Sequence, residues 1–203
     1  MTHKEIYRIC EKYAGSIPTT YNINEDMSIS VDLIVDLYDK HLTEIPIKFK
    51  EVSSSFDCSN NKLTSLKNCP ERVGNNFYCY GNQLTTLEYC PDHIGNNFYC
   101  NSNSLKTLDH FPISVGGDSY CEYNQLTNFD GLPEFFEQPI YLLGNPVYEI
   151  YKLFNEDPRC IYYLRDYDVI RGNKVIRDRL EEVFHTLEME VPKDIILKEY
   201  ILI

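Results

Sequence analysis

The fold is decided by three successive 21-residue segments: FDCSNNKLTSLKNCPERVGNN (56–76), FYCYGNQLTTLEYCPDHIGNN (77–97) and FYCNSNSLKTLDHFPISVGGD (98–118). The same frame continues more loosely from Ser119 and from Ile140, and it extends backwards to Val35. About six such units are enough to bury a continuous core between them, so the repeat predicts a stacked solenoid.

Each unit contains an asparagine that is followed two residues later by an aliphatic residue. The asparagines are Asn61, Asn82, Asn103, Asn124 and Asn145, and the aliphatic residues are Leu63, Leu84, Leu105, Leu126 and Val147. An asparagine amide both donates and accepts hydrogen bonds, so stacked copies can form a ladder where each strand turns away. This spacing is the leucine-rich-repeat signature. It predicts an α/β repeat fold, a short leucine-rich-repeat solenoid with a parallel sheet on its concave face.

Two further apolar columns are expected on the convex side of the core. They are Leu66, Leu87, Leu108, Phe129 and Ile150, and then Val73, Ile94, Val115 and Phe136. Prolines recur between them at positions 70, 91, 112 and 133. Because proline favours extended and turn conformations over helix, this part of each unit should be an extended or turn-like return arm.

Four cysteines, Cys58, Cys79, Cys100 and Cys121, occupy the inward position of successive predicted strands. A small, weakly polar thiol packs well in such a core. A metal site or a redox ladder is the alternative, because neighbouring strands bring equivalent positions within about 5 Å of each other. The chain has no C-x-x-C pair and no histidine in this register, so we expect reduced core cysteines, no metal and no cofactor.

The two ends depart from the repeat and predict three regions along the chain. These are residues 1–34 as an N-terminal helix and capping segment, residues 35–154 as the solenoid, and residues 155–203 as a C-terminal cap. A helix is expected at 3–14 and a strand at 28–37, with further helices at 147–154, 158–167 and 173–187. The apolar residues 194–203 should pack back as a strand or extended arm.

The residues that flank the inward cysteines should point out from the concave sheet. The position before the cysteine holds Asp57, Tyr78, Tyr99, Tyr120 and Tyr141, and the position after it holds Ser59, Tyr80, Asn101, Glu122 and Leu143. From these we select Tyr78, Tyr80, Tyr99, Asn101, Tyr120, Glu122 and Tyr141 as candidate partner-binding residues. Tyrosine is enriched at binding hot spots, although stacked tyrosines can also serve only to stabilise a sheet.

Charge and motifs argue against several classes of function. With 19 Lys and Arg against 31 Asp and Glu, the net charge is −12, which disfavours direct binding to nucleic acid. The N-terminus has neither a secretory signal nor a membrane span, so we expect a cytoplasmic protein that does not bind membranes. The five histidines are dispersed and no phosphate-binding loop is present, so the chain is not expected to be an enzyme. Asp166 and Asp168 are a weak candidate for cation binding.

The units between residues 56 and 133 read F-x-C-x-x-N-x-L-x-x-L-x-x-C-P, and in this they resemble short bacterial and phage-encoded leucine-rich-repeat proteins. The tail from Gly144 to Phe184 looks like the C-terminal segments of the phage-type proteins. The units are also similar to the repeats of secreted bacterial effectors, but they carry one extra residue before the strand. The chain also lacks an evident ubiquitin-ligase domain. The resemblance to the phage-type proteins implies a protein that acts in the host cytoplasm.

Three functions remain open from the sequence. The first is a protein-protein interaction module, which the resemblance extends to a phage protein that binds and inhibits a host factor. The second is a structural or self-associating protein. The third is an acidic decoy that mimics nucleic acid, which the net charge favours but the predominance of tyrosine and amide side chains on the predicted face disfavours.

Overall fold

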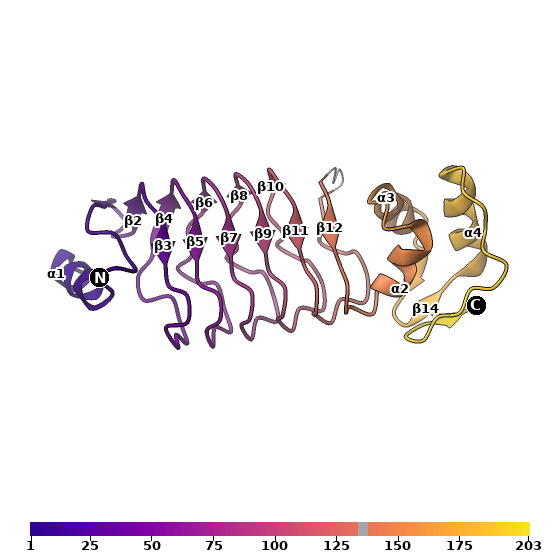
Figure 1. Ribbon diagram of the computed structural model, residues 1–203, viewed down its shortest axis with the longest axis horizontal. Helices are drawn as coiled ribbons and strands as arrows, with labels where there is room; N and C mark the ends of the chain where they lie inside the picture. Colours follow the sequence, from indigo (N-terminus) through magenta and orange to yellow (C-terminus); the bar gives the residue numbers. More distant parts are fainter. Residues whose placement is uncertain (134–137) are drawn as a thin grey trace.

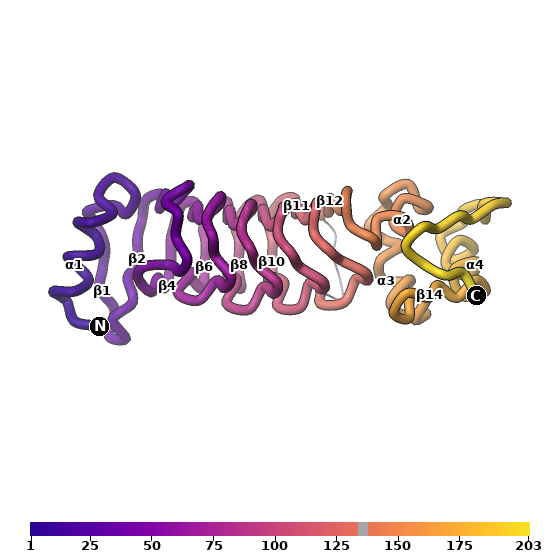
Figure 2. The backbone as a smooth tube through the Cα atoms, turned by 90° about the horizontal axis from the view of Figure 1, so that it is seen from below, coloured from indigo at the N-terminus to yellow at the C-terminus, as the bar shows by residue number. Residues whose placement is uncertain are grey.

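The computed structural model describes residues 1–133 and 138–203. Its central part is a row of stacked coils between one N-terminal helix and a group of C-terminal helices (Figure 1). Figure 2 shows the same row from below, with each coil beside the next. Strands of successive coils pair in parallel, Phe56 with Phe77 and Phe77 with Phe98, which confirms the predicted repeat solenoid.

One parallel sheet is formed by the F-x-C segments and is the sheet that we expected on the concave face. Its strands are β3 (Val35–Asp36), β5 (Phe56–Asp57), β7 (Phe77–Tyr78), β9 (Phe98–Tyr99), β11 (Ser119–Tyr120) and β12 (Ile140–Tyr141). The parallel pairing of neighbouring coils continues beyond these short strands. For example, the Cys58 N–H donates to the Tyr78 carbonyl at 2.9 Å. We call this the tyrosine sheet.

The return arm is more regular than expected, because it forms a second sheet. Its strands are β1 (Asn22–Ile23), β2 (Ile29–Val31), β4 (Phe49–Val52), β6 (Arg72–Val73), β8 (His93–Ile94) and β10 (Ser114–Val115). All pairs in it are parallel except β1 with β2. Val73 and Ile94 are buried and Val115 is half-buried, whereas Phe136 of the same predicted column lies outside the described residues.

The two sheets meet at a corner where the coils touch backbone to backbone. A Cβ atom on Gly74 would lie 2.0 Å from the Ser53 carbonyl oxygen, and one on Gly95 would lie 2.1 Å from the Gly74 carbonyl oxygen. Gly116 repeats this contact at 2.3 Å from the Gly95 carbonyl oxygen. Neither Gly74 nor Gly95 has a left-handed φ, so glycine is required here for space rather than for backbone conformation.

The repeated asparagine lies where each coil leaves the tyrosine sheet and bonds the backbone of two coils. Asn82 Oδ1 accepts from the Leu63 N–H at 3.0 Å, and its Nδ2 donates to the carbonyls of Cys58 and Cys79 at 3.0 and 3.1 Å. Equivalent contacts are made by Asn61, Asn103, Asn124 and Asn145. The structure therefore contains a continuous asparagine ladder.

The cysteines of the repeat form a column inside the stack. Cys58, Cys79, Cys100 and Cys121 are all 0% exposed, and the Sγ atoms of Cys100 and Cys121 are 3.4 Å apart. All eight cysteines of the chain are free, and every one is buried except the half-buried Cys90. Burial raises the pKa of the Cys79 and Cys100 thiols, so these groups stay protonated at neutral pH.

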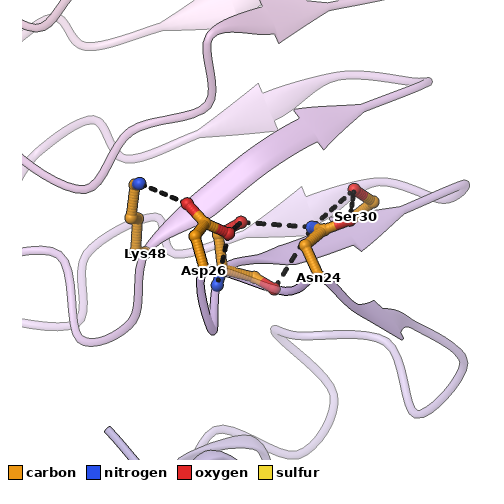
Figure 3. A network of polar contacts seen from close by, with 5 residues as sticks. Asn24, Asp26, Ser30 and Lys48 are labelled. Carbon is orange, nitrogen blue, oxygen red and sulfur yellow. Dashed lines mark hydrogen bonds and ion pairs between the residues drawn. The ribbon is translucent and has the colours of Figure 1, made fainter.

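The N-terminal helix α1 (His3–Lys12) lies at the first end of the stack and buries Ile6 and Cys10. Its first turn is closed by a capping box between Thr2 and Glu5. The adjoining turn before β2 is fastened to the first coils by a polar network (Figure 3). In it Asp26 accepts from the Ser28 backbone N–H and pairs with Lys48, while Asn24 Nδ2 donates to Ser30 Oγ at 3.0 Å. The Lys48 ammonium holds the pKa of the Asp26 carboxyl below its usual range.

The C-terminal end is covered by α2 (Tyr148–Tyr151), a 3-10 turn η1 (Lys152–Phe154), α3 (Arg159–Asp166) and α4 (Arg177–Thr186). The helix expected at 173–187 begins only at Arg177, because Gly172, with φ +60°, turns a hairpin between β13 (Ile170–Arg171) and β14 (Lys174–Val175). The tail returns as β15 (Ile201–Leu202) beside β14, as a strand or arm was expected to do. Tyr200 fastens the tail to the last coils through a 2.6 Å hydrogen bond to the Thr127 carbonyl.

Candidate partner-binding face

Four tyrosines stand in a column on the outer side of the tyrosine sheet. The ring centroids of Tyr78 and Tyr99 are 4.7 Å apart, those of Tyr99 and Tyr120 are 4.5 Å apart, and those of Tyr120 and Tyr141 are 4.8 Å apart. The interplanar angles are 15°, 2° and 14° in the same order, so the rings are stacked nearly parallel. Each ring is thereby held by its neighbours. The conformational entropy of these side chains is therefore already lost before any partner binds.

A second polar ladder, which the sequence analysis missed, holds the hydroxyl ends of this column. Asn76 Nδ2 donates to the Tyr78 hydroxyl at 3.0 Å, and Asn97 Nδ2 donates to the Tyr99 hydroxyl at 3.2 Å. Each amide also reaches the next coil, because Asn76 Oδ1 accepts from the Asn97 N–H at 3.0 Å. The signal in the sequence is the Gly-Asn-Asn that precedes β7 and β9, at 74–76 and 95–97.

The last member of this ladder is acidic rather than amide. Asp118 accepts a hydrogen bond from the Tyr120 hydroxyl at 3.3 Å, and its backbone N–H donates to Asn97 Oδ1 at 2.9 Å. Tyr78, Tyr99 and Tyr120 are therefore ordered in two ways, by stacking between ring faces and by hydrogen bonding at the hydroxyl.

The position after each inward cysteine forms a second column beside the tyrosines. Tyr80, Asn101 and Glu122 are half-buried in it, and Leu143 is 48% exposed. Ser59 differs from the expectation, because it is 0% exposed and its backbone N–H donates to Asp57 Oδ1 at 2.9 Å. We call the seven selected residues of the two columns the tyrosine face: Tyr78, Tyr80, Tyr99, Asn101, Tyr120, Glu122 and Tyr141.

Glu122 is the electrostatically distinctive member of the tyrosine face. Its Oε2 atom is buried and has no hydrogen-bond partner among the described residues. Burial raises the pKa of the Glu122 carboxyl. A carboxylate in this position gains more from an added cation than one that is fully solvated.

Other chemistry has little support in the structure. Asp168 pairs with Arg171 and Arg179 instead of facing an open cation site, and His93 Nδ1 lies 2.8 Å from Ser114 Oγ on the second sheet. Within residues 1–133 and 138–203, no three His, Cys, Asp or Glu side chains are grouped to hold a metal ion. None of the helices in those ranges has the length and apolarity needed to cross a membrane.

No protein-family model, curated protein or solved structure matches the chain.

The tyrosine column makes one pH-dependent contribution to stability that can be measured directly. Burial, and then the neighbouring Tyr99, raise the pKa of Tyr120 to about 12. Because this exceeds the ordinary tyrosine pKa of about 10, the folded chain holds the proton more tightly than the unfolded chain does. The stabilisation is complete below pH about 10 and is lost as the pH rises toward about 12.

The pKa of Tyr21 is also raised to about 12, so we expect the tyrosinate absorbance that develops near pH 12 in the native chain to fall by one phenol, not to disappear, in Tyr120→Phe. The same titration in concentrated urea is the control, because unfolding removes the burial. Loss of absorbance near pH 10 rather than near pH 12 on substitution would contradict the prediction.

Proposed function

We propose that the protein is a non-enzymatic protein-protein interaction module that binds its partner through the tyrosine face. The observation that carries this proposal is the stacked column, in which four rings are held within 4.8 Å of their neighbours. Rigid tyrosines offer large contact areas at little further entropic cost, and their hydroxyls add directional hydrogen bonds. Binding hot spots are enriched in tyrosine for these reasons.

The C-terminal end of the column adds surface of the same kind. Tyr141 is 38% exposed, Leu143 is 48% exposed and Tyr123 is 60% exposed, and the three lie on neighbouring coils β11 and β12. Apolar groups rimmed by polar ones are typical of protein interfaces. The finer proposal, that the chain is a phage protein that binds and inhibits a host factor in the host cytoplasm, is supported by the sequence resemblance alone.

Two alternatives make different predictions about this face. In a structural role the tyrosines only strengthen pairing between coils, so their loss would change stability and nothing else. In self-association the partner is a second copy of the chain, so the apparent mass in solution would rise with concentration. Sedimentation of the native chain over a range of concentrations separates self-association from binding to a different protein.

We expect the triple substitution Tyr78→Ala, Tyr99→Ala and Tyr120→Ala to weaken partner binding by roughly thirtyfold or more, since hot-spot truncations cost about 2 kcal/mol or more. The measurement is retention of a partner from bacterial lysate on the immobilised chain, followed by titration of the retained protein. A matched triple substitution on the exposed return turns, Lys67→Ala, Glu88→Ala and Asp109→Ala, is expected to leave binding unchanged.

Folding of both variants has to be checked by circular dichroism and urea denaturation, because the tyrosine variant also loses stacking between coils. A folded tyrosine variant that retains the partner, together with loss of the partner by the return-turn variant, would place the binding surface elsewhere and refute the proposal.

A further inference from the structure

Neighbouring rings of the tyrosine column lie close enough to react with each other, and the closest pair in the column is Tyr99 with Tyr120. Their strands, β9 and β11, are adjacent in the tyrosine sheet, with Tyr99 opposite Tyr120 (Figure 1). The ring centroids are 4.5 Å apart and the ring planes differ by 2°. Both hydroxyls are directed toward the residue two positions earlier, Asn97 in one coil and Asp118 in the next. The ortho carbons of one phenol therefore face the ortho carbons of the other.

Alignment distinguishes this pair from a second pair of tyrosines at a similar distance. The rings of Tyr162 and Tyr163 in α3 have centroids 5.1 Å apart, but their planes meet at 85°. Perpendicular rings direct the edge of one at the face of the other, so their ortho carbons do not face each other. The column therefore combines proximity with the alignment that bond formation between two rings requires.

Tyr120 has a proton acceptor at its hydroxyl. The hydroxyl donates to Asp118 Oδ2 at 3.3 Å, and a carboxylate can take up the proton completely. The hydroxyl of Tyr99 is instead contacted by the Asn97 amide N–H, which cannot accept a proton. A phenol that loses an electron becomes strongly acidic, and a positioned base that takes its proton makes the electron easier to remove. Oxidation of the column therefore starts at Tyr120.

The thiols behind these rings are the competing site of oxidation. Cys100 and Cys121 have Sγ atoms 3.4 Å apart, but both residues are 0% exposed on the inner side of the sheet. Burial raises the pKa of the Cys100 thiol, and a protonated thiol is oxidised more slowly than a thiolate. The rings of Tyr99 and Tyr120 are only half-buried. An oxidant in solution therefore meets the phenols before it meets the thiols.

We propose that Tyr99 and Tyr120 are a modification site, which two-electron oxidation converts into a dityrosine that joins neighbouring coils. Each phenol gives up one electron and one proton, and the proton goes to Asp118 from Tyr120 and to water from Tyr99. A carbon–carbon bond forms between one ortho carbon of each ring, and the two ortho hydrogens move to the oxygens, which restores both hydroxyls. Hydrogen peroxide, acting through a haem peroxidase, takes up the two electrons and two protons and becomes two molecules of water.

The bond changes the mechanics of the stack and does not depend on a partner, so the inference goes beyond the proposed function. It ties the coil of β9 to the coil of β11 through a permanent link. A covalent link between distant residues restricts the unfolded chain, so the cross-linked solenoid is expected to unfold at a higher urea concentration.

The test oxidises the full-length chain at low concentration with a haem peroxidase and hydrogen peroxide, and then isolates the monomer under denaturing and reducing conditions. Trypsin cleaves after Lys and Arg, so it places Tyr99 in the peptide 73–106 and Tyr120 in the peptide 107–152. We expect these two peptides to remain joined, with the loss of two hydrogen atoms and with dityrosine fluorescence. Reduction is included because a disulfide in the column of cysteines would join the same peptides, whereas dityrosine survives reduction.

Tyr120→Phe keeps a ring in the stack but removes the phenol, so we expect it to lose the joined peptides. Tyr123→Phe is the matched control and should leave their yield unchanged, because Tyr123 lies on the same peptide and is 60% exposed but stands outside the column. Asp118→Asn provides the side chain that Asn97 has at the equivalent position, so the fold is expected to tolerate it. It should slow cross-linking roughly tenfold or more, because it removes the positioned proton acceptor.

Three results would overturn the inference. The peptides 73–106 and 107–152 of the oxidised monomer separate on reduction; the joined peptides survive Tyr120→Phe or are lost in Tyr123→Phe; or dityrosine is found only in covalent dimers. An unchanged rate of cross-linking in folded Asp118→Asn would overturn the step in which oxidation starts at Tyr120.

Discussion

Gly95→Ala is expected to destabilise the solenoid by about 3 kcal/mol, at the upper end of the usual range for overpacking. The new Cβ atom would lie 2.1 Å from the Gly74 carbonyl oxygen, which is backbone and has no side-chain rotamer by which to move away. Relief requires the two coils to separate, and separation strains the parallel pairing of β6 with β8 and of β7 with β9. The measurement is the free energy of unfolding in urea, followed by far-ultraviolet circular dichroism.

Asn96→Ala is the matched control for this substitution, because Asn96 is the exposed neighbour of Gly95 and also becomes an alanine, but without a new Cβ atom in the corner. It should change the free energy of unfolding by less than about 0.5 kcal/mol, as surface substitutions usually do. Equal urea midpoints for the two variants would show that the coils are not in backbone contact at this corner.

Asn82→Ala is expected to destabilise the fold by about 1–3 kcal/mol, because it leaves a buried donor without a partner. The Leu63 N–H loses its acceptor, and the carbonyls of Cys58 and Cys79 each lose one of two amide donors. Asn103→Ala should destabilise the fold for the same reason, because the Leu84 N–H loses its acceptor. Gln83→Ala, at an exposed position beside the ladder, is the control. Unchanged urea midpoints for both asparagine variants would contradict the role of the ladder.

The parts of the fold that could be predicted are those in which every coil repeats the same contact. The asparagine register and the inward phenylalanines and cysteines follow from the 21-residue period, because stacked coils place equivalent residues side by side. The second sheet could not be predicted, since strands of two residues such as Arg72–Val73 are too short to show alternation. Pro70 and Gly74 around that strand also favour interpretation as an irregular arm.

The candidate site was predictable in position but not in detail. A parallel sheet with tyrosine at one outward position necessarily stacks Tyr78, Tyr99 and Tyr120, so the column follows once the register is known. The amide ladder of Asn76 and Asn97 carried a periodic signal, the Gly-Asn-Asn at 74–76 and 95–97, but the sequence alone does not show that these amides donate to tyrosine hydroxyls. The unpartnered oxygen of Glu122 carried no signal in the sequence, because the equivalent positions of the other coils hold different residues and the repeat gives no pattern for it.

The column of buried thiols places one reactive group in each of four coils, so the opening of each coil can be followed by alkylation of its cysteine. An alkylating reagent attacks the thiolate, and the interior sulfurs are shielded from solvent as long as their coil is closed, while burial also raises the pKa of Cys79 and Cys100. The labelling rate at each cysteine therefore reports how often that coil opens, without any introduced probe. Because Cys58, Cys79, Cys100 and Cys121 lie on four consecutive coils, their relative rates form a map of breathing along the molecule. Faster labelling of Cys58 or Cys121 would show that the stack frays from an end, and faster labelling of Cys79 or Cys100 would show that it opens from the middle.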